Sequence, residues 1–214
     1  MNRIELLDTL PNVFATNSSI DSQVWRQELT FERGKLYLIE ANSGGGKSSL
    51  CSYIYGTRGD YQGVINFDNR AISTLSSDEW MTLRQSGLSM LFQDLRLFGE
   101  LTALENIELK NQLTHFKKRE QIISLFEVLG IGDKLNSRVE HLSFGQQQRV
   151  AFIRSLCQPF DFILLDEPIS HLDSANGKNV AEILLSEAQT QGAGIITTSI
   201  GHHLPLPYDS ILKL

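Results

Sequence analysis

Residues 36–50 read LYLIEANSGGGKSSL, and this stretch decides the fold class. Its apolar first part, Leu36 to Ile39, predicts a short buried strand. The loop from Ala41 to Gly46 is rich in small residues, so that successive backbone N–H groups can turn inward around an anion. A helix is expected to begin at Lys47. The order of strand, glycine-rich loop and helix predicts a site for the phosphates of a nucleotide.

Two side chains in this segment, which we call the phosphate loop, carry chemistry of their own. Lys47 would reach the β- and γ-phosphates, and the Ser48 hydroxyl would coordinate Mg²⁺. The pattern G-x-x-x-x-G-K-[ST] has Gly where this chain has Ala41, which is a departure. A flexible glycine turn is the alternative interpretation. The residues expected to hold the nucleotide are Asn42, Ser43, Gly44, Gly45, Gly46, Lys47, Ser48 and Ser49.

A second buried strand is predicted where residues 162–165 read FILL. Asp166 follows at its carboxyl end, where ligands of open α/β sheets bind. Asp166 can hold a metal ion through water, and Glu167 can act as the general base toward an attacking water. The alternative is a strand followed by a solvated acidic turn. The upstream phosphate loop disfavours that alternative.

A third motif, LSFGQ at residues 142–146, precedes a helix predicted from Gln146 to Cys157. By composition Ser143 is a candidate helix N-cap. Here the chain resembles the ATP-binding cassette (ABC) ATPases, whose signature motif LSGGQ appears with Phe144 in place of a glycine. Phe144 would therefore have to point away from the nucleotide. The resemblance covers essentially the whole chain and rests on five motifs in the family's order.

The resemblance implies further site residues. Gln93, within MLFQD, matches the glutamine that touches the metal and reports nucleotide state to a membrane partner. Phe14 lies where the family places an aromatic ring against adenine, a stack worth roughly 1–3 kcal/mol; packing in the core is the alternative for this residue. The segment SHLD at residues 170–173 matches the loop that crosses the dimer interface. Residues implied to contact the nucleotide from a second copy are Ser143, Gly145, Gln146 and Asp173.

One position departs from the family in a way that affects catalysis. The family's switch histidine follows an apolar strand and a Thr, and here Ser199 follows Thr198. The resemblance therefore implies Glu167, Gln93 and Ser199 as the catalytic set, with slow hydrolysis because Ser stands in for His. The competing hypothesis is that His202 or His203 takes over the role of the switch histidine.

The distribution of patterns predicts an α/β fold: a P-loop NTPase (RecA-like) core with an inserted α-helical subdomain and an N-terminal antiparallel β region. From Asp94 to Gln158 the pattern is helical throughout. We expect three parts, namely residues 1–93 (first part of the core), 94–160 (helical signature subdomain) and 161–214 (second part of the core). The strands are expected at residues 24–31, 36–40, 64–67, 88–92, 162–165 and 194–198. The segment FQDLRLFGELTALENIEL resembles the ABC branch serving lipoprotein release, macrolide export and cell division.

Composition limits the function classes. With 214 residues and 41% hydrophobic content the chain can bury a full core, and its net charge of −6 offers no basic footprint for nucleic acid. Cys51 and Cys157 fit reduced thiols in a cytoplasmic protein. No apolar stretch approaches the length of a membrane span, so we expect no direct membrane insertion. Localisation is expected to be cytoplasmic, peripheral on the inner face of the membrane through a separate permease.

Two functions remain at this point. The favoured one is the ATP-binding and ATP-hydrolysing subunit of an ABC transporter or related membrane complex. It would use ATP and Mg²⁺, bind ATP at the interface of a homodimer, and energise a separate transmembrane permease through dimer closure. The alternative is a soluble ABC ATPase that acts as an ATP-dependent switch on a cytosolic partner.

Overall fold

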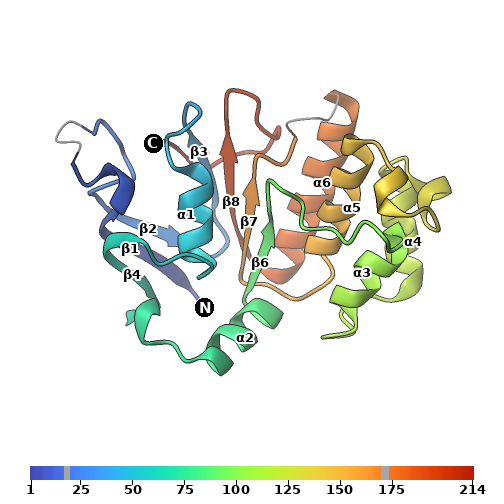
Figure 1. The fold of residues 1–214 in the computed structure, drawn as a ribbon, viewed down its shortest axis with the longest axis horizontal. Coiled ribbons are helices and arrows are strands. Elements are labelled where there is room, and N and C mark those ends of the chain that lie inside the picture. The colour runs from blue at the N-terminus through green and yellow to red at the C-terminus, as the bar shows by residue number, and fades with distance from the viewer. Residues whose placement is uncertain (17–19, 170–173) are drawn as a thin grey trace.

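The computed structural model describes residues 1–16, 20–169 and 174–214, and it contains two sheets with helices around them (Figure 1). The first sheet is antiparallel, with the order β2 (Glu28–Glu32), β1 (Arg3–Pro11), β4 (Tyr61–Phe67) and β5 (Arg70–Ala71). The second sheet is parallel, with the order β6 (Leu88–Leu91), β7 (Phe162–Asp166), β8 (Gly194–Ser199), β3 (Leu36–Glu40) and β9 (Ser210–Lys213). The predicted fold class is confirmed.

Six α-helices accompany the sheets in the described part of the chain. Three of them, α3 to α5, lie together at one end of the molecule in Figure 1, next to α6 and away from the antiparallel sheet. The helices are α1 (Lys47–Ile54), α2 (Ser77–Ser86), α3 (Ala103–Asn111), α4 (Arg119–Val128), α5 (Phe144–Ser155) and α6 (Ser174–Gln191). Short 3₁₀ turns occur at Asn12–Phe14, Ile72–Thr74, Gly132–Lys134 and Val139–His141.

The parallel sheet separates two hydrophobic cores, because successive side chains of a strand point to opposite faces. In β7, Phe162 and Leu164 pack in the core formed with α1 and the antiparallel sheet. Their neighbours Ile163 and Leu165 pack in the core formed with α3 to α6. A strand covered on both faces must be apolar throughout, which explains the uninterrupted run that the sequence displays here.

The strand order brings the motifs together. β3, which leads into the phosphate loop, lies beside β8, and β8 lies beside β7. All three run parallel, with Glu40 opposite Ser199 and Asp166 opposite Thr198. The residues that follow these strand ends therefore meet at one edge of the sheet, where ligands of such folds bind.

Two expectations about local structure were wrong. The expected strand at residues 24–31 begins only at Glu28, because the Ser22 hydroxyl accepts hydrogen bonds from the backbone N–H groups of Val24 (3.0 Å) and Trp25 (2.8 Å) and holds them in a turn. Helical structure was expected from Asp94 onward, but the first helix after that point, α3, begins only at Ala103. Before it the chain is irregular, with positive φ at Leu95.

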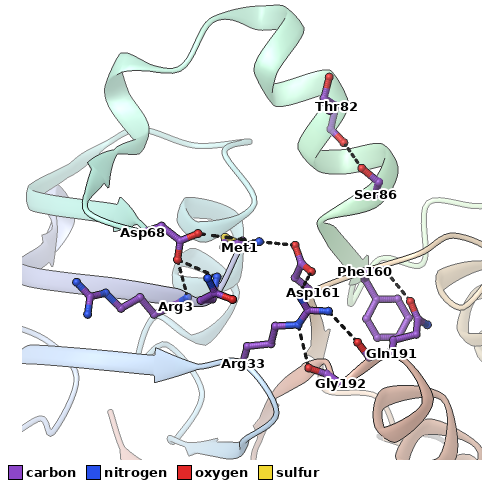
Figure 2. Close-up of polar contacts among 11 residues, drawn as sticks. Met1, Arg3, Arg33, Asp68, Thr82, Ser86, Phe160, Asp161, Gln191 and Gly192 are labelled. Carbon is purple, nitrogen blue, oxygen red and sulfur yellow. Dashed lines mark hydrogen bonds and ion pairs between the residues drawn. The ribbon is translucent and has the colours of Figure 1, made fainter.

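The two sheets are tied together by Arg33, which lies between β2 and β3 (Figure 2). Its guanidinium is 2.7 Å from Asp161, just before β7, and it donates to the carbonyls of Gln191 (2.8 Å) and Gly192 (2.9 Å) at the end of α6. The Gln191 side chain in turn accepts from the backbone N–H of Phe160 at 2.9 Å. This arginine therefore connects the antiparallel sheet to the segments that flank β7 and β8.

Candidate functional site

The phosphate loop connects β3 to α1 with the geometry expected of an anion-binding turn. Gly44 and Gly46 have φ of +84° and +96°, a conformation that favours glycine. α1 begins at Lys47, as predicted. A Cβ added at Gly45 would come within 2.9 Å of the Cβ of Ala41, so that the methyl group at the unusual position fills the space above Gly45. The turn therefore forms with Ala41 at the first glycine position of the pattern, but the Ala41 methyl group leaves no room for a side chain at position 45.

A cavity of about 340 Å³ opens beside this loop. Residues from five distant parts of the chain converge on it: the turn after β1, the phosphate loop with α1, the segment after β6, the end of β7 and the end of β8. The lining residues are Val13, Phe14, Ser43, Gly44, Gly46, Lys47, Ser48, Ser49, Gln93, Glu167 and Ile200. Asn42 and Gly45 contribute to the loop through their backbone carbonyls, which accept from Lys47 and Trp25, respectively.

Lys47 is almost fully buried at the base of the cavity. Its ammonium donates to the carbonyls of Ala41 (3.2 Å) and Asn42 (3.1 Å) and lies 3.5 Å from a carboxylate oxygen of Glu167. A buried cation costs free energy unless it is paired and hydrogen-bonded, and here it is both. The positive charge of Lys47 is thus held beside the phosphate loop, where an anionic ligand in the cavity can reach it.

Glu167 is positioned by an unusual backbone conformation. β7 ends at Asp166, and Glu167 has φ of +51°, which costs a non-glycine residue of order 1–3 kcal/mol. The turn directs its carboxylate toward Lys47 and toward Gln93, whose Nε2 donates to it at 3.4 Å. The Glu167 carbonyl accepts from Gln148 of α5 at 3.2 Å. Backbone strain of this kind is found mostly at functional sites, so it marks Glu167 as a residue whose carboxylate must point into the cavity.

The Ser48 hydroxyl, the Gln93 amide and the Asp166 carboxylate share the lining of a neighbouring cavity of about 320 Å³. The other lining residues are Ser52, Met90, Phe92, Asp94 and Arg96. The Ser48 hydroxyl donates to Gln93 Oε1 at 3.1 Å, which places the two oxygens on the same side of the loop. Asp166 is buried at the end of β7. Hydroxyl, amide and carboxylate oxygens are the ligands that Mg²⁺ prefers, so this donor set fits the predicted metal.

Phe14, on the 3₁₀ turn after β1, lines the first cavity. Its ring also packs on Gly46, since a Cβ there would be 3.2 Å from the ring. The Trp25 ring lies beside the same glycine, since a Cβ at Gly46 would be 3.0 Å from it, and its Nε1 donates to the Gly45 carbonyl at 3.1 Å. Sequence reasoning missed Trp25, because nothing in its surroundings in the chain links it to the loop.

The signature motif lies away from this cavity. Ser143 is the N-cap of α5: its hydroxyl accepts from the N–H of Gln146, and the Gln146 side chain accepts from the Ser143 N–H. Ser143 and Phe144 are exposed. α1 and α5 stand on opposite sides of β6 and β7 in Figure 1, and the described lining of the phosphate-loop cavity includes no residue of the signature motif. The predicted contact residue Asp173 lies outside the described residues.

Ser199 does not line the phosphate-loop cavity. It is 1% exposed, and its hydroxyl donates to the carbonyl of His202 at 2.6 Å. The next residue, Ile200, lines the cavity instead. His202 and His203 are exposed, and the His203 ring packs against Tyr208. Hence neither the serine nor the two histidines line the cavity formed with the phosphate loop.

Thr198 is a second residue that sequence reasoning missed. It is buried at the end of β8, and its hydroxyl donates to Asp166 Oδ1 at 2.7 Å and accepts from the N–H of Glu167 at 3.1 Å. The only signal in the sequence is a Thr at the carboxyl end of a buried strand. Strand order and register, which bring it opposite Asp166, are not readable locally.

Comparison with known proteins identifies the family of this site. The family described as ABC transporter matches residues 25–170. An uncharacterized ABC transporter ATP-binding protein of Methanocaldococcus jannaschii is 35% identical over 189 residues, which cover 87% of this chain and 84% of that protein. The macrolide export ATP-binding/permease protein MacB of Aggregatibacter actinomycetemcomitans is 34% identical over 189 residues, 87% of this chain. This chain spans only 29% of the length of that MacB protein.

Solved structures agree with this assignment. The ATP-binding cassette MJ0796, a dimer in a post-hydrolysis state bound to ADP and Pi, superposes with a TM-score of 0.76 at 26% identity, covering 92% of this chain and 87% of that one. Within the described ranges, no helix combines the length and the apolar character needed to cross a membrane.

Proposed function

This chain belongs to the ABC transporter family, and we propose that it is the ATP-binding and ATP-hydrolysing subunit of a membrane complex that energises a separate permease. One observation carries the proposal: Lys47, Ser48, Gln93 and Glu167 line a single cavity beside the glycine-rich loop. The cation of Lys47 suits the phosphates of a triphosphate, and the hydroxyl of Ser48 and the amide of Gln93 suit its metal ion. The carboxylate of Glu167 suits an attacking water. We keep the division into residues 1–93, 94–160 and 161–214 as part of this proposal.

The roles of the residues follow from their positions. The loop N–H groups and Lys47 bind the phosphates, and Phe14 stacks on the base. Ser48, Gln93 and Asp166 would hold Mg²⁺, which neutralises phosphate charge when bound. Glu167 accepts the proton of the attacking water.

The reaction is then limited by the orientation of that water. In this family the switch histidine would hold it in line with Glu167. Ser199 donates its hydroxyl to the His202 carbonyl, and the cavity wall at this point is the apolar Ile200. We propose that the isolated protein binds ATP well and hydrolyses it slowly.

The signature motif supports a shared site. Ser143 and Gly145 begin a helix whose N-terminal N–H groups suit a phosphate, yet they lie away from the phosphate loop of their own chain. A second copy, rotated by twofold symmetry, would bring each motif opposite the other copy's loop. We therefore propose a homodimer that closes on ATP. The solved structure of the related cassette MJ0796, which is a dimer, supports this proposal.

A test of the shared site uses Glu167→Gln, which keeps the shape of the side chain but removes the proton acceptor. ATP should stay trapped between two copies, so that size-exclusion chromatography moves this variant from monomer to dimer when ATP is added. Lys47→Ala, which loses the phosphate contact, is the control and should stay monomeric. A monomer at saturating ATP for Glu167→Gln would contradict the shared site.

A groove beside Gln93 is our candidate for the permease contact. It has a volume of about 240 Å³ and lies between β6 and α3, with Phe98, Leu109 and Leu113 on its rim. Phe98 and Leu113 are more than half exposed and Leu109 is 44% exposed, so three apolar side chains of one groove are open to a partner. Gln158 also lines the groove, and its buried amide oxygen has no hydrogen-bond partner among the described residues.

The permease contact can be tested with two matched variants. Leu113→Asp changes the groove, and Val128→Asp changes an equally exposed apolar residue at the end of α4. Purification of the tagged chain from detergent-solubilised membranes of its native cells should recover a membrane protein with the wild type and with Val128→Asp, but not with Leu113→Asp. Recovery of only non-membrane partners would favour the alternative, an ATP-dependent switch on a cytosolic protein.

A further inference from the structure

Thr198 occupies a position between the two acidic residues of the site. Its single hydroxyl donates to Asp166 Oδ1 at 2.7 Å and accepts from the backbone N–H of Glu167 at 3.1 Å. The residue is 1% exposed, so water does not compete for either bond. Both hydrogen bonds cross from β8 to the end of β7, where Thr198 is the register partner of Asp166.

The direction of these two bonds is set by chemistry. A carboxylate can only accept and a backbone N–H can only donate, so a group that joins them must do both, as the Thr198 hydroxyl does. Donation to a charged oxygen makes the hydroxyl oxygen a stronger acceptor for the N–H of Glu167. A side chain without a hydroxyl would leave the buried Asp166 oxygen and the N–H of Glu167 without these partners.

The second bond acts on a strained residue. Glu167 has φ of +51°, and this conformation sends its carboxylate toward Lys47 and Gln93. Its N–H lies at the point where the chain leaves the strand, so the bond to Thr198 holds the turn on the amino side while Gln148 holds the carbonyl. The first bond simultaneously restricts rotation of the Asp166 carboxylate.

We propose that Thr198 is a positioning residue that orients Asp166 toward the metal side of the site and Glu167 toward the attacking water. The inference rests on the proposed function, which assigns those two roles. It predicts two separable effects of losing the hydroxyl. One is a weaker contribution of Mg²⁺ to ATP binding, through Asp166. The other is a slower chemical step, through Glu167.

The neighbouring Thr197 provides a matched control. It is equally buried, and its hydroxyl donates to the Tyr208 hydroxyl at 3.1 Å and contacts the Tyr37 carbonyl at 3.4 Å, on the side of β8 away from Asp166. Thr197→Val and Thr198→Val delete the same atom at the same depth in the same strand. They differ in whether that atom touches the acidic pair.

The experiment compares wild type, Thr198→Val, Thr198→Ser and Thr197→Val as full-length proteins. Calorimetric titration with ATP is performed once with Mg²⁺ and once with EDTA, and a single-turnover assay measures hydrolysis. In Thr198→Val, the gain in affinity that Mg²⁺ provides and the single-turnover rate should each fall about 10–100-fold, the usual effect of removing a partner that orients a metal ligand. Affinity for ATP in EDTA should equal that of the wild type. Thr198→Ser should restore both quantities, and Thr197→Val should leave both unchanged.

Several results would overturn the inference. They are retention of both quantities in Thr198→Val, equal losses in Thr197→Val, and failure of Thr198→Ser to restore them. Urea unfolding of each variant separates these effects from loss of the fold, and Thr198→Ala replaces Thr198→Val if the latter does not fold. A wild-type protein that binds no ATP under either condition would instead overturn the proposed function, and this inference with it.

Discussion

The ammonium of Lys47 lies 3.5 Å from a carboxylate oxygen of Glu167, although the two residues come from opposite halves of the chain. One begins α1 and the other follows β7. The ion pair satisfies a buried cation and a mostly buried anion at the same time. A nucleotide phosphate and Glu167 therefore compete for the same lysine.

Replacement of Lys47 by Ala should weaken MgATP binding at least about tenfold, because hydrogen bonds between charged partners contribute about 1.5–3 kcal/mol each. Titration calorimetry measures the loss. Lys117→Ala is the control, since Lys117 is also a buried lysine in an ion pair, with Glu187, outside the phosphate loop. Equal affinity of Lys47→Ala and wild type would refute the binding site.

The variant Glu167→Gln should bind MgATP more tightly than the wild type. The amide keeps the hydrogen-bonding shape, but it no longer neutralises Lys47 or repels the phosphates. Titration under conditions that prevent hydrolysis, with a non-hydrolysable ATP analogue, gives the comparison. Weaker binding by Glu167→Gln would indicate that the ion pair supports the loop conformation instead of competing with the nucleotide.

A substitution at Gly45 should test the packing of the phosphate loop. In Gly45→Ala the new methyl group would meet Ala41 Cβ at 2.9 Å, so the loop must shift and ATP affinity should fall. The double variant Ala41→Gly/Gly45→Ala removes that contact and should recover part of the affinity, with the Asn42 carbonyl at 3.3 Å limiting full recovery. Gly59→Ala, where a Cβ meets nothing within 4 Å, is the control. No rescue in the double variant would disprove the steric account.

Exchange of Ser199 for His removes the hydrogen bond to the His202 carbonyl, so the longer imidazole can turn toward the cavity and contact the γ-phosphate. The turnover number should rise, with little change in ATP binding. Steady-state ATPase assays on Ser199→His, His202→Ala and His203→Ala give the test. The wild type is expected to be slow and insensitive to both alanine substitutions. If turnover is ordinary and one of them abolishes it, that histidine performs the switch role. Brisk hydrolysis without either histidine would contradict both hypotheses.

Stability should fall at alkaline pH because of Cys157. Burial raises the pKa of its thiol from 9.0 to about 12. Between these values the unfolded chain releases a proton that the folded chain keeps, so the free energy of unfolding decreases by about 1.4 kcal/mol per pH unit. Below pH 9 this stabilisation is fully present. Urea unfolding at pH 8 and pH 10.5 should show an extra loss of about 2 kcal/mol in the wild type relative to Cys157→Ala. Parallel pH dependence of the two proteins would rule out the effect.

Much of the fold was predictable because its signals are local. β3 and the start of α1 lie where the pattern of apolar residues and glycines places them, and β7 and β8 differ from expectation by one residue at an end. The strand at residues 24–31 was mispredicted because apolar composition does not reveal that the Ser22 hydroxyl captures the N–H groups of Val24 and Trp25. A side chain that caps a turn competes with a sheet ladder, and only coordinates show which one forms.

The sequence by itself determined the family, the order of the motifs and the residues that carry charge, since each of these is written within a few consecutive positions. Only the tertiary structure decided which of those residues touch. The contact of Lys47 with Glu167, the bridge from Thr198 to Asp166 and the turning of Ser199 toward the His202 carbonyl depend on strand order, register and backbone direction. These contacts join positions distant along the chain or depend on how a loop folds back, and no local pattern encodes that arrangement.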